Sequence, residues 1–321
     1  MSLQNSNREP CTILLPIYNS YNFLNRSLQN LLYIAGPNDE VLVINDGSLD
    51  LSQEILDGFQ KLDKRISVYN RQHEGLVSSL NFGIQNAKFE YIARADVDDH
   101  YDVNRLDLQI EFLENNRDIS AVFSDYEMVD LDGASLGKFP CAISPELTLF
   151  SLVSSQRTAH PSVMYRKTAI LEAGGYLKED FPAEDLALWI RLVEKGKIAS
   201  LPEELLKYTL HRNSVTSNHK NSMRLKSLAL RKSFADKQIT PFALDQFHRN
   251  LLVYNKKANS NLRVLFALQD LMTFNKLTES RHQKKVRTLI FWELLLWNVR
   301  LIPPLLYVFF MRQKRKSYNI K

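Results

Sequence analysis

Three carboxylates stand within four residues at Asp96, Asp98 and Asp99, directly after the apolar run 91–93. Carboxylates this close repel one another, so they are stable together only in water or around a cation. Mg²⁺ and Mn²⁺ bind oxygen ligands, commonly one or two carboxylates together with phosphate oxygens. The segment therefore predicts a divalent cation held between the protein and a phosphate group. An acidic loop in water is the alternative.

Two further polar segments follow apolar runs. Pro16-Ile17-Tyr18-Asn19 follows the first run and Asn45-Asp46-Gly47-Ser48 follows the second. The Tyr18 ring could stack on a nucleobase, and the Asp46 carboxylate could accept a hydrogen bond from a base N–H. The alternatives are a tyrosine at a sheet edge and a helix-capping loop. Neither segment is glycine-rich, which excludes the dinucleotide fingerprint and the phosphate loop of nucleotide hydrolases.

The elements that must position these residues alternate between short apolar runs and amphipathic segments. Strands are predicted over 11–15, 40–45, 66–70 and 91–96, and helices over 21–34, after Ser48 or Asp50, and over 76–86. Strands that alternate with helices of this length are typical of an α/β fold whose central sheet is mainly parallel and covered by helices. Open sheets of this kind bind ligands at the carboxyl ends of their strands, where the polar segments stand. A Rossmann-like nucleotide-binding half is therefore predicted over about 10–99.

The second half of the chain has a less regular pattern. Helices are predicted over 104–116, 145–154, 167–173 and 185–195, strands over 121–129, 162–165, 198–201 and 205–210, and a turn over 131–133. From Asn218 onward the pattern is helical. These elements predict an acceptor half over about 100–217, within one catalytic domain of residues 1–217, followed by a helical C-terminal region of residues 218–321.

The net charge of +5 is concentrated at the end of the chain. Residues 281–321 contain ten lysines and arginines and one glutamate, so the remaining residues carry a net charge of −4. A basic surface spread over the fold, as nucleic-acid binding requires, is thereby excluded. Cys11 and Cys141 provide neither a disulfide framework nor metal-ligand spacing, and the first ten residues lack an apolar signal sequence. A cytoplasmic protein is predicted.

An apolar stretch lies within this basic region, over residues 289–310. Glu293, Arg300 and Pro303-Pro304 interrupt it, so it does not provide the roughly 18 uninterrupted apolar residues of a spanning helix. Aromatic residues flanked by basic ones are typical of segments that lie on anionic membranes. We predict a membrane-surface segment over about 281–316, which would make the protein peripheral on the cytosolic face of the membrane. A helix that docks on the catalytic domain is the alternative.

Five motifs together resemble the family 2 glycosyltransferases, which are inverting enzymes with the GT-A fold. They are Pro16-Ile17-Tyr18-Asn19, Asn45-Asp46-Gly47-Ser48, the segment Arg94–Asp99, the segment His160–Lys167, and Ala183-Glu184-Asp185 with the helix that follows. The resemblance covers about Pro10 to Ser217. Within this family, the chain most resembles bacterial enzymes that extend lipid-linked glycans for surface polysaccharides. The order and spacing of the five motifs make a chance match improbable.

The resemblance implies a role for each matching residue. Asp185 would be the catalytic base, with Glu184 beside it, and Asp98 would hold the cation, with Asp96 and His211 near it. The remaining matching residues would bind the donor nucleotide-sugar, and they are Pro16, Tyr18, Asn19, Asp46, Arg94, Asp96 and His160. For His160 the alternative of fixing a loop stays open, and His73 receives no role.

Inverting displacement at a sugar carbon requires two separate acidic groups. The acceptor hydroxyl needs a base on the face opposite the leaving group, and the departing diphosphate is stabilised by a divalent cation. Asp185 and Asp98 can divide these tasks. The predicted reaction is transfer of a sugar from a nucleotide-sugar, with UDP as the first choice, to a hydroxyl of a lipid-linked glycan, with Mn²⁺ or Mg²⁺. The alternatives are a nucleotidyltransferase acting on sugar phosphates and a non-catalytic nucleotide-sugar-binding protein.

Overall fold

The computed structural model describes residues 8–141, 152, 158–211, 214 and 219–238. The chain divides into two compact units, Met1–Pro145 with Gln156–Leu230 and Glu146–Ser155 with Arg231–Lys321. The sheet and the candidate site belong to the first unit.

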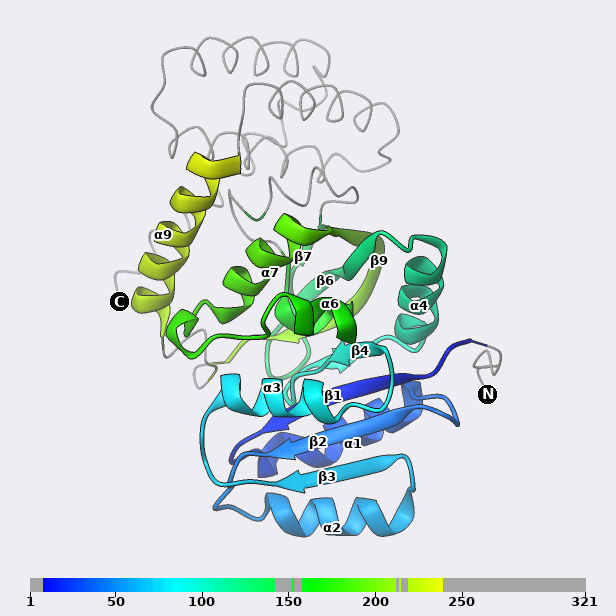
Figure 1. The fold of residues 1–321 in the computed structure, drawn as a ribbon. Helices are drawn as coiled ribbons and strands as arrows, with labels where there is room; N and C mark the ends of the chain where they lie inside the picture. Colours follow the sequence, from blue (N-terminus) through cyan, green and yellow to red (C-terminus); the bar gives the residue numbers. More distant parts are fainter. Residues whose placement is uncertain (1–7, 142–151, 153–157, 212–213, 215–218, 239–321) are drawn as a thin grey trace. The chain divides into compact units, whose positions relative to one another are not determined.

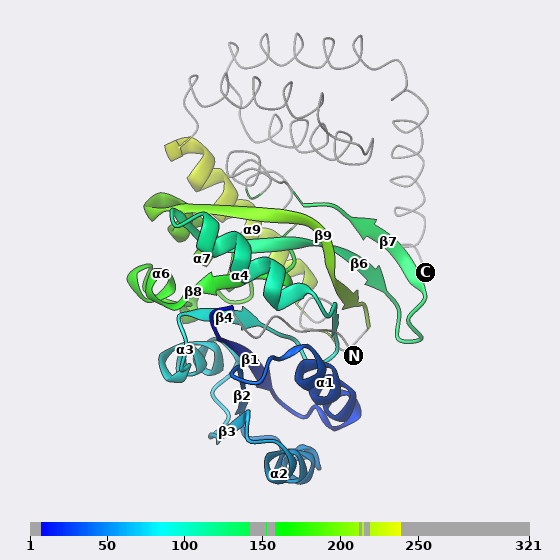
Figure 2. The ribbon, with the colours of Figure 1, turned by 90° about the vertical axis from the view of Figure 1, so that its right-hand side faces the viewer.

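The first half of the fold is a parallel sheet with helical crossovers (Figure 1). Its strands are β1 (Cys11–Ile17), β2 (Glu40–Asn45), β3 (Ile66–Asn70) and β4 (Tyr91–Arg94), which pair in the order β3-β2-β1-β4. Helices α1 (Tyr21–Ile34), α2 (Ser52–Leu62) and α3 (Leu76–Asn86) connect these strands. Figure 2 shows α1 and α3 on opposite faces of the sheet. All residues of β1 and β2 are buried, as expected for strands covered on both faces.

The second half of the sheet has mixed strand directions. It contains β5 (His100–Tyr101), β6 (Ile119–Val129), β7 (Ser135–Phe139), β8 (Met164–Arg166) and β9 (Lys197–Thr209). β8 pairs antiparallel with both β4 and β6 and so joins the halves into one sheet of order β3-β2-β1-β4-β8-β6-β9-β5. β6 and β9 run parallel, whereas β7 is antiparallel to β6 and β5 is antiparallel to β9.

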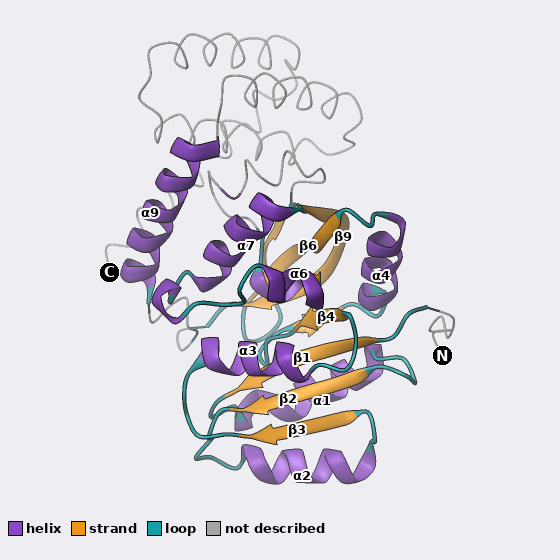
Figure 3. Cartoon of the chain, in the orientation of Figure 1, coloured by secondary structure: helices purple, strands orange, loops and turns teal. Residues whose placement is uncertain are grey.

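Helices pack around this second half (Figure 3). They are α4 (Arg105–Asn115), α6 (Lys167–Glu172) and α7 (Glu184–Lys195), with the 3₁₀ helices η1 (His160–Ser162) and η2 (Lys178–Asp180). Helix α9 (Lys220–Gln238) follows and extends from the first unit into the second. α4 packs against β6, and α7 packs against β9. Helix α7 matters most for the site, because it begins at the predicted catalytic acids.

Two buried polar side chains of α4 hold the junction between the halves. Arg105 is fully buried, and its Nη2 donates to the carbonyls of Arg94 and Val163 at 2.8 and 3.1 Å. Gln109 donates through Nε2 to the carbonyls of Val122 and Ser162 at 3.2 and 2.8 Å. Buried backbone carbonyls require such partners where regular pairing ends. The end of β4 is therefore fixed relative to β6 and η1.

The α/β fold with a helix-covered sheet is confirmed, and most predicted elements are present. The predicted ranges 21–34, 40–45, 66–70 and 76–86 coincide with α1, β2, β3 and α3. Parallel pairing is confined to β3-β2-β1-β4 and β6-β9, because β8 enters the sheet in the opposite direction. The strand predicted over 91–96 ends at Arg94, and the strand predicted over 162–165 is β8, which follows η1.

Two predictions about strand ends were wrong. Pro16 does not stop the first strand, which continues to Ile17. The Leu14 carbonyl accepts from the Ala95 N–H, so the backbone of Leu14 faces β4. Pro16, two residues further along, faces the same side, but β4 has already ended there. The N–H that proline lacks would therefore have had no strand partner. The strands predicted over 198–201 and 205–210 are the single strand β9, whose pairing with β6 shifts register between Leu201 and Glu204.

Other sequence predictions fall outside the described residues. They are the helix over 145–154, of which only residue 152 is described, and the membrane-surface segment over 281–316. Within the residues that the structure describes, no helix is both long enough and apolar enough to cross a membrane.

Candidate functional site

The three acids after β4 converge. Asp96, Asp98 and Asp99 each offer a carboxylate oxygen, and these oxygens lie within 4.8 Å of one another. Asp99 is buried, and its Oδ2 has no hydrogen-bond partner among the described residues. Convergent carboxylate oxygens, one of them buried without a partner, suit a divalent cation such as Mg²⁺ or Mn²⁺. The residues therefore fit the predicted ion.

His211 reaches this cluster from the end of β9. Its Nε2 lies 2.7 Å from Asp98 Oδ2, and its ring lies 5.4 Å from that of Phe23 on α1. The Thr209 N–H donates to Asp99 Oδ1 at 2.8 Å and so ties the end of β9 to the acidic loop. The structure thus brings together all three residues that the resemblance placed around the cation, and it adds Asp99.

Burial and mutual repulsion make the acidic cluster electrostatically unfavourable by itself. Burial raises the pKa of Asp99 well above its ordinary value, and the charges of Asp98 and Asp96 raise it further. Burial also raises the pKa of Asp96, against the opposing effect of Arg94. A positive charge placed among these oxygens would relieve the repulsion.

Arg94 places a positive charge beside the acidic cluster. The buried guanidinium forms an ion pair with the Asp96 carboxylate. Burial lowers the pKa of Arg94, but the charge and hydrogen bond of Asp96, together with the charges of Tyr101 and Tyr176, raise it by more in total, so the guanidinium stays charged. Burial and the nearby Arg94 charge lower the pKa of His160 well below its ordinary value. His160 is therefore neutral at neutral pH, with its Nε2 2.7 Å from the Tyr176 hydroxyl.

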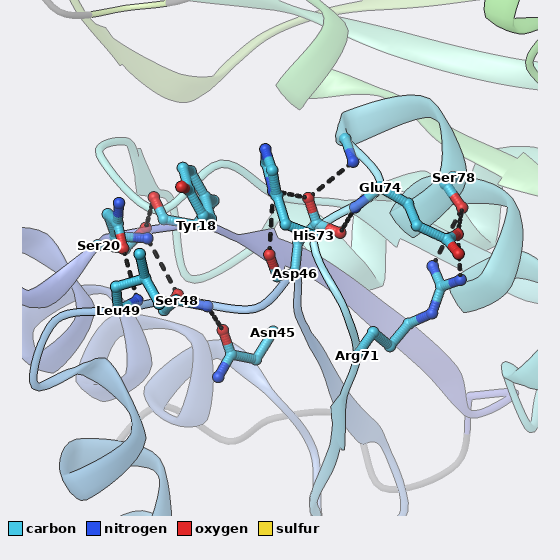
Figure 4. A network of polar contacts seen from close by, with 12 residues as sticks. Tyr18, Ser20, Asn45, Asp46, Ser48, Leu49, Arg71, His73, Glu74 and Ser78 are labelled. Carbon is cyan, nitrogen blue, oxygen red and sulfur yellow. Dashed lines mark hydrogen bonds and ion pairs between the residues drawn. The ribbon is translucent and has the colours of Figure 1, made fainter.

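Asp46 is bound by the loop between β3 and α3 (Figure 4). Its Oδ1 accepts from the Glu74 N–H at 3.0 Å, and its Oδ2 accepts from the Gly75 N–H at 2.9 Å. His73 Nδ1 lies 2.8 Å from the same Oδ2. The carboxylate that was predicted to bind a base edge is thus also the anchor of this loop.

Tyr18 and Asn19 leave β1 beside Asp46. The imidazole of His73 stacks on the Tyr18 ring, with centroids 4.0 Å apart and planes 20° apart. Asn19 joins the loops that follow β1 and β2: its N–H donates to Ser48 Oγ at 3.0 Å, and its Oδ1 accepts from the Leu49 N–H at 2.8 Å. Pro16 lies within β1 and is buried. Direct contacts therefore join the loops that carry Tyr18, Asn19 and Asp46.

Glu184 and Asp185 begin helix α7. Glu184 is buried, and its Oε2 has no hydrogen-bond partner within the described part of the chain. Burial and the charge of Asp185 raise the pKa of Glu184 to about 7. Asp185 is only partly buried, and its Oδ1 accepts from the Leu186 N–H at 2.7 Å. The more accessible acid of the pair is thus the one predicted to be the base.

A network of side chains fixes the segment that leads into α7. Asn81 on α3 donates through Nδ2 to the Tyr176 carbonyl at 2.7 Å and accepts from the Tyr176 N–H at 2.9 Å. Arg191 on α7 donates to the Gly175 carbonyl and forms an ion pair with Asp180 at 2.8 Å. The segment is therefore held between α3 and α7. Because the Tyr176 hydroxyl also contacts His160, the same network links α7 to η1.

The two groups of acids share one electrostatic environment but differ in chemistry. The charges of Arg94 and Asp96 both influence the pKa of Glu184. The acids after β4 converge on a position suited to a cation, whereas Glu184 and Asp185 stand on a separate element. This arrangement can bind an anionic diphosphate through a cation at one end and accept a proton at the other.

Sequence reasoning missed two residues of this arrangement. Asp99 belonged to the acidic cluster that predicted the cation, although the resemblance gave it no role of its own. His73 and Tyr176 gave no signal, because their partners Tyr18, Asp46 and His160 come from other loops.

Fold and site together define a protein of the GT-A glycosyltransferase class. Residues 12–168 match the model of the family described as glycosyl transferase family 2, and this part of the chain belongs to that family. The candidate teichuronic acid biosynthesis glycosyltransferase TuaG of Bacillus subtilis is 29% identical over 212 residues, which cover 64% of this chain and 81% of TuaG. Three uncharacterized glycosyltransferases of Rickettsia species are longer, and the match covers only 30%, 34% and 32% of their length.

Solved structures confirm the fold. Residues 1–349 of Staphylococcus aureus TarS in complex with UDP-GlcNAc superpose with a TM-score of 0.60 at 16% identity, covering 88% of this chain and 86% of that one. The mannosyltransferase PcManGT of Pyrobaculum calidifontis, in complex with GDP-Man and Mn²⁺, gives a TM-score of 0.54 at 15% identity and covers 87% of this chain and 83% of its own.

Proposed function

We propose that this protein is an inverting glycosyltransferase that moves a sugar from a UDP-sugar to a hydroxyl of a lipid-linked glycan. The observation that carries the proposal is the division of the acids into two sets, Asp96, Asp98 and Asp99 after β4 and Glu184 and Asp185 at the start of α7. Inverting transfer needs a cation site and a separate base, and each set suits one of these tasks.

Asp96, Asp98 and Asp99 would hold Mn²⁺ or Mg²⁺, with His211 beside Asp98. When bound, such an ion stabilises the negative charge that develops on a departing diphosphate. Arg94 keeps a positive charge next to these acids, so it reduces their repulsion and orients Asp96. Tyr18 and Asp46 would receive the nucleobase.

Asp185 would take the proton from the acceptor hydroxyl. Its position in the first turn of α7 fixes its direction, and the buried Glu184 provides a second acid beside it. Because the pKa of Glu184 is raised to about 7, this neighbour is partly protonated at neutral pH. A protonated Glu184 adds less repulsion to Asp185, which favours one ionised base over two competing charges.

The relatives support the choice of donor and pathway. TarS was solved with UDP-GlcNAc and PcManGT with GDP-Man and Mn²⁺, and TuaG is assigned to teichuronic acid biosynthesis. UDP and a cell-surface polysaccharide are therefore the proposed choices. A nucleotidyltransferase is less well supported, because no glycine stands in the loop between β1 and α1.

The proposal is tested by offering the purified protein a panel of UDP-, GDP- and TDP-sugars with Mn²⁺ and lipid-linked acceptors, and by identifying products by mass spectrometry. A product whose new bond has the anomeric configuration opposite to that of the donor is expected. Nucleotide transfer to a sugar phosphate, or a retained configuration, would contradict the proposal.

We further propose that the segment of residues 281–316 attaches the protein to the cytosolic face of the membrane. The support is its sequence alone, a basic region around an interrupted apolar stretch. Truncation after Glu279 is expected to move the protein from the membrane fraction to the soluble fraction. Carbonate or high salt should partly release the full-length chain, measured by immunoblotting. Retention of the truncated protein on membranes would contradict the proposal.

A further inference from the structure

His73 makes two specific contacts that neither the sequence nor the family match explains. Its ring stacks on Tyr18 at 4.0 Å, and its Nδ1 lies 2.8 Å from Asp46 Oδ2 and 3.1 Å from the Asp46 carbonyl oxygen. Both oxygens are acceptors, so we assign the proton of the imidazole to Nδ1. His73 therefore presents a flat ring to Tyr18 and an N–H to Asp46 (Figure 4).

These are the two interactions that the proposed function assigns to the nucleobase of the donor. A base would place its ring against Tyr18 and an N–H against Asp46. We propose that His73 occupies the nucleobase position in the ligand-free protein, as an internal competitor that the donor must displace. The inference rests on the proposed function, because it requires Tyr18 and Asp46 to be the base-binding residues.

The surroundings of His73 permit its side chain to leave without rearrangement of the loop. The Glu74 and Gly75 N–H groups hold the loop on Asp46, and neither bond involves the imidazole. The His73 side chain is 53% exposed, so it can rotate into water. Rotation of an exposed side chain is fast compared with loop rearrangement. The competitor can therefore be displaced while the anchor of the loop stays in place.

The backbone keeps His73 within reach of its partners. Gly47, with φ +72°, lies so close to this loop that a Cβ atom there would be 2.8 Å from the His73 backbone nitrogen. Only glycine permits both that conformation and that approach. The loops after β2 and β3 are thus packed together at the point where the imidazole must reach Asp46.

A competitor of this kind lowers the apparent affinity for every donor that carries a base. The observed dissociation constant equals the intrinsic one divided by the fraction of molecules in which the site is open. If His73 fills the site in most molecules, its removal should tighten UDP binding by about five- to tenfold. A ligand that has no base should bind equally well with or without the imidazole.

The experiment is calorimetric titration of His73→Ala and wild type with UDP and with inorganic pyrophosphate, each in Mn²⁺. We expect about five- to tenfold tighter UDP binding by the variant and unchanged pyrophosphate binding. Gln72→Ala is the control, since Gln72 is exposed in the same loop, and it should change neither affinity.

Three results would overturn the inference. Unchanged or weaker UDP binding by His73→Ala would mean that the imidazole does not compete with the base. An equal change for UDP and pyrophosphate would show a general effect on the loop. Failure of wild type and variant alike to bind UDP, while the cation still binds, would refute the donor site itself and with it the proposed function.

Discussion

Asp185→Asn is expected to abolish sugar transfer while leaving UDP binding nearly unchanged. Removal of a general base typically costs about 10²–10⁴-fold in rate. Asparagine keeps the size of the side chain and its carbonyl can still accept from the Leu186 N–H, so helix α7 should begin as before. The proposed nucleotide contacts lie on other elements, around Tyr18 and Asp46. Initial rates with a radiolabelled UDP-sugar and calorimetry with UDP measure the two effects separately.

Two companion variants make this result interpretable. Glu194→Gln changes an exposed acid on the same helix and should retain full activity. Glu184→Gln removes the neighbouring acid but leaves Asp185 in place, so it should reduce the rate less than Asp185→Asn does. If Glu184→Gln is inactive while Asp185→Asn turns over normally, Glu184 is the base. Normal turnover by both variants would refute the assigned mechanism.

Asp98→Ala is expected to remove the dependence of UDP binding on Mn²⁺. Asp98 is the acid that both converges with Asp96 and Asp99 and contacts His211, so its loss removes the centre of the cation site. Loss of a partner that only supports a metal ligand already costs 10–100-fold in metal affinity, so a loss of at least about 100-fold is expected here. Calorimetry with Mn²⁺ alone, and with UDP in the presence of Mn²⁺ or EDTA, provides the measurement.

The matched control for this variant is Asp132→Ala. Asp132 is an exposed acid in the turn between β6 and β7, and its replacement should leave Mn²⁺ and UDP binding as in wild type. If the Asp98→Ala variant still binds UDP more tightly with Mn²⁺ than with EDTA, Asp98 is not part of the cation site.

The parallel half of the fold could be predicted from sequence because each of its elements is determined locally. The helix Tyr21–Ile34 and the strand Glu40–Asn45 have the predicted bounds, since their apolar periodicity is strong and turn residues flank them. β5 was missed because a strand of two residues is too short to show a periodic pattern. β7 was missed because it is a largely exposed strand without alternating apolar residues.

Strand direction in the second half could not be predicted for a different reason. β8 is three residues long, and its direction depends on its pairing with β4 and β6. These partners lie far away in the sequence, so no pattern within β8 reports them. The long strand β9 was predicted as two strands because Pro202 is typical of a strand end. Its neighbour β6 continues past this point, and so the pairing continues after a change of register.

The same distinction between local patterns and long-range contacts applies to the candidate site. The acids at positions 96, 98 and 99 were predicted because a cluster of carboxylates is visible in a sequence, and Glu184 and Asp185 were predicted through the resemblance to family 2 glycosyltransferases. The contacts of Asp99 with Thr209 and of His73 with Tyr18 were not, since each joins residues that only the folded chain brings together. In this protein, sequence patterns indicated which chemistry is available, and tertiary contacts determine which atoms can perform it.

The bond between Asp99 and Thr209 spans 110 residues, and it has a consequence for synthesis on the ribosome. The family match ends at residue 168. When the ribosome has added this residue, strands β1 to β8 have all been made, and β9 has not. One edge of β6 can then pair with β7 and β8, but its other edge has no neighbour until β9 emerges. An unpaired edge in a nascent chain is a site for wrong associations.

Closure of that edge coincides with completion of the proposed catalytic groups. Glu184, Asp185 and His211 all follow residue 168, and β9 carries the Thr209 N–H that holds the acidic loop. The nascent chain should therefore complete the proposed cation site in the same late event that protects β6. A released fragment of residues 1–168 should expose this edge and lack the catalytic acids, so a truncated translation product would be both prone to aggregation and inactive.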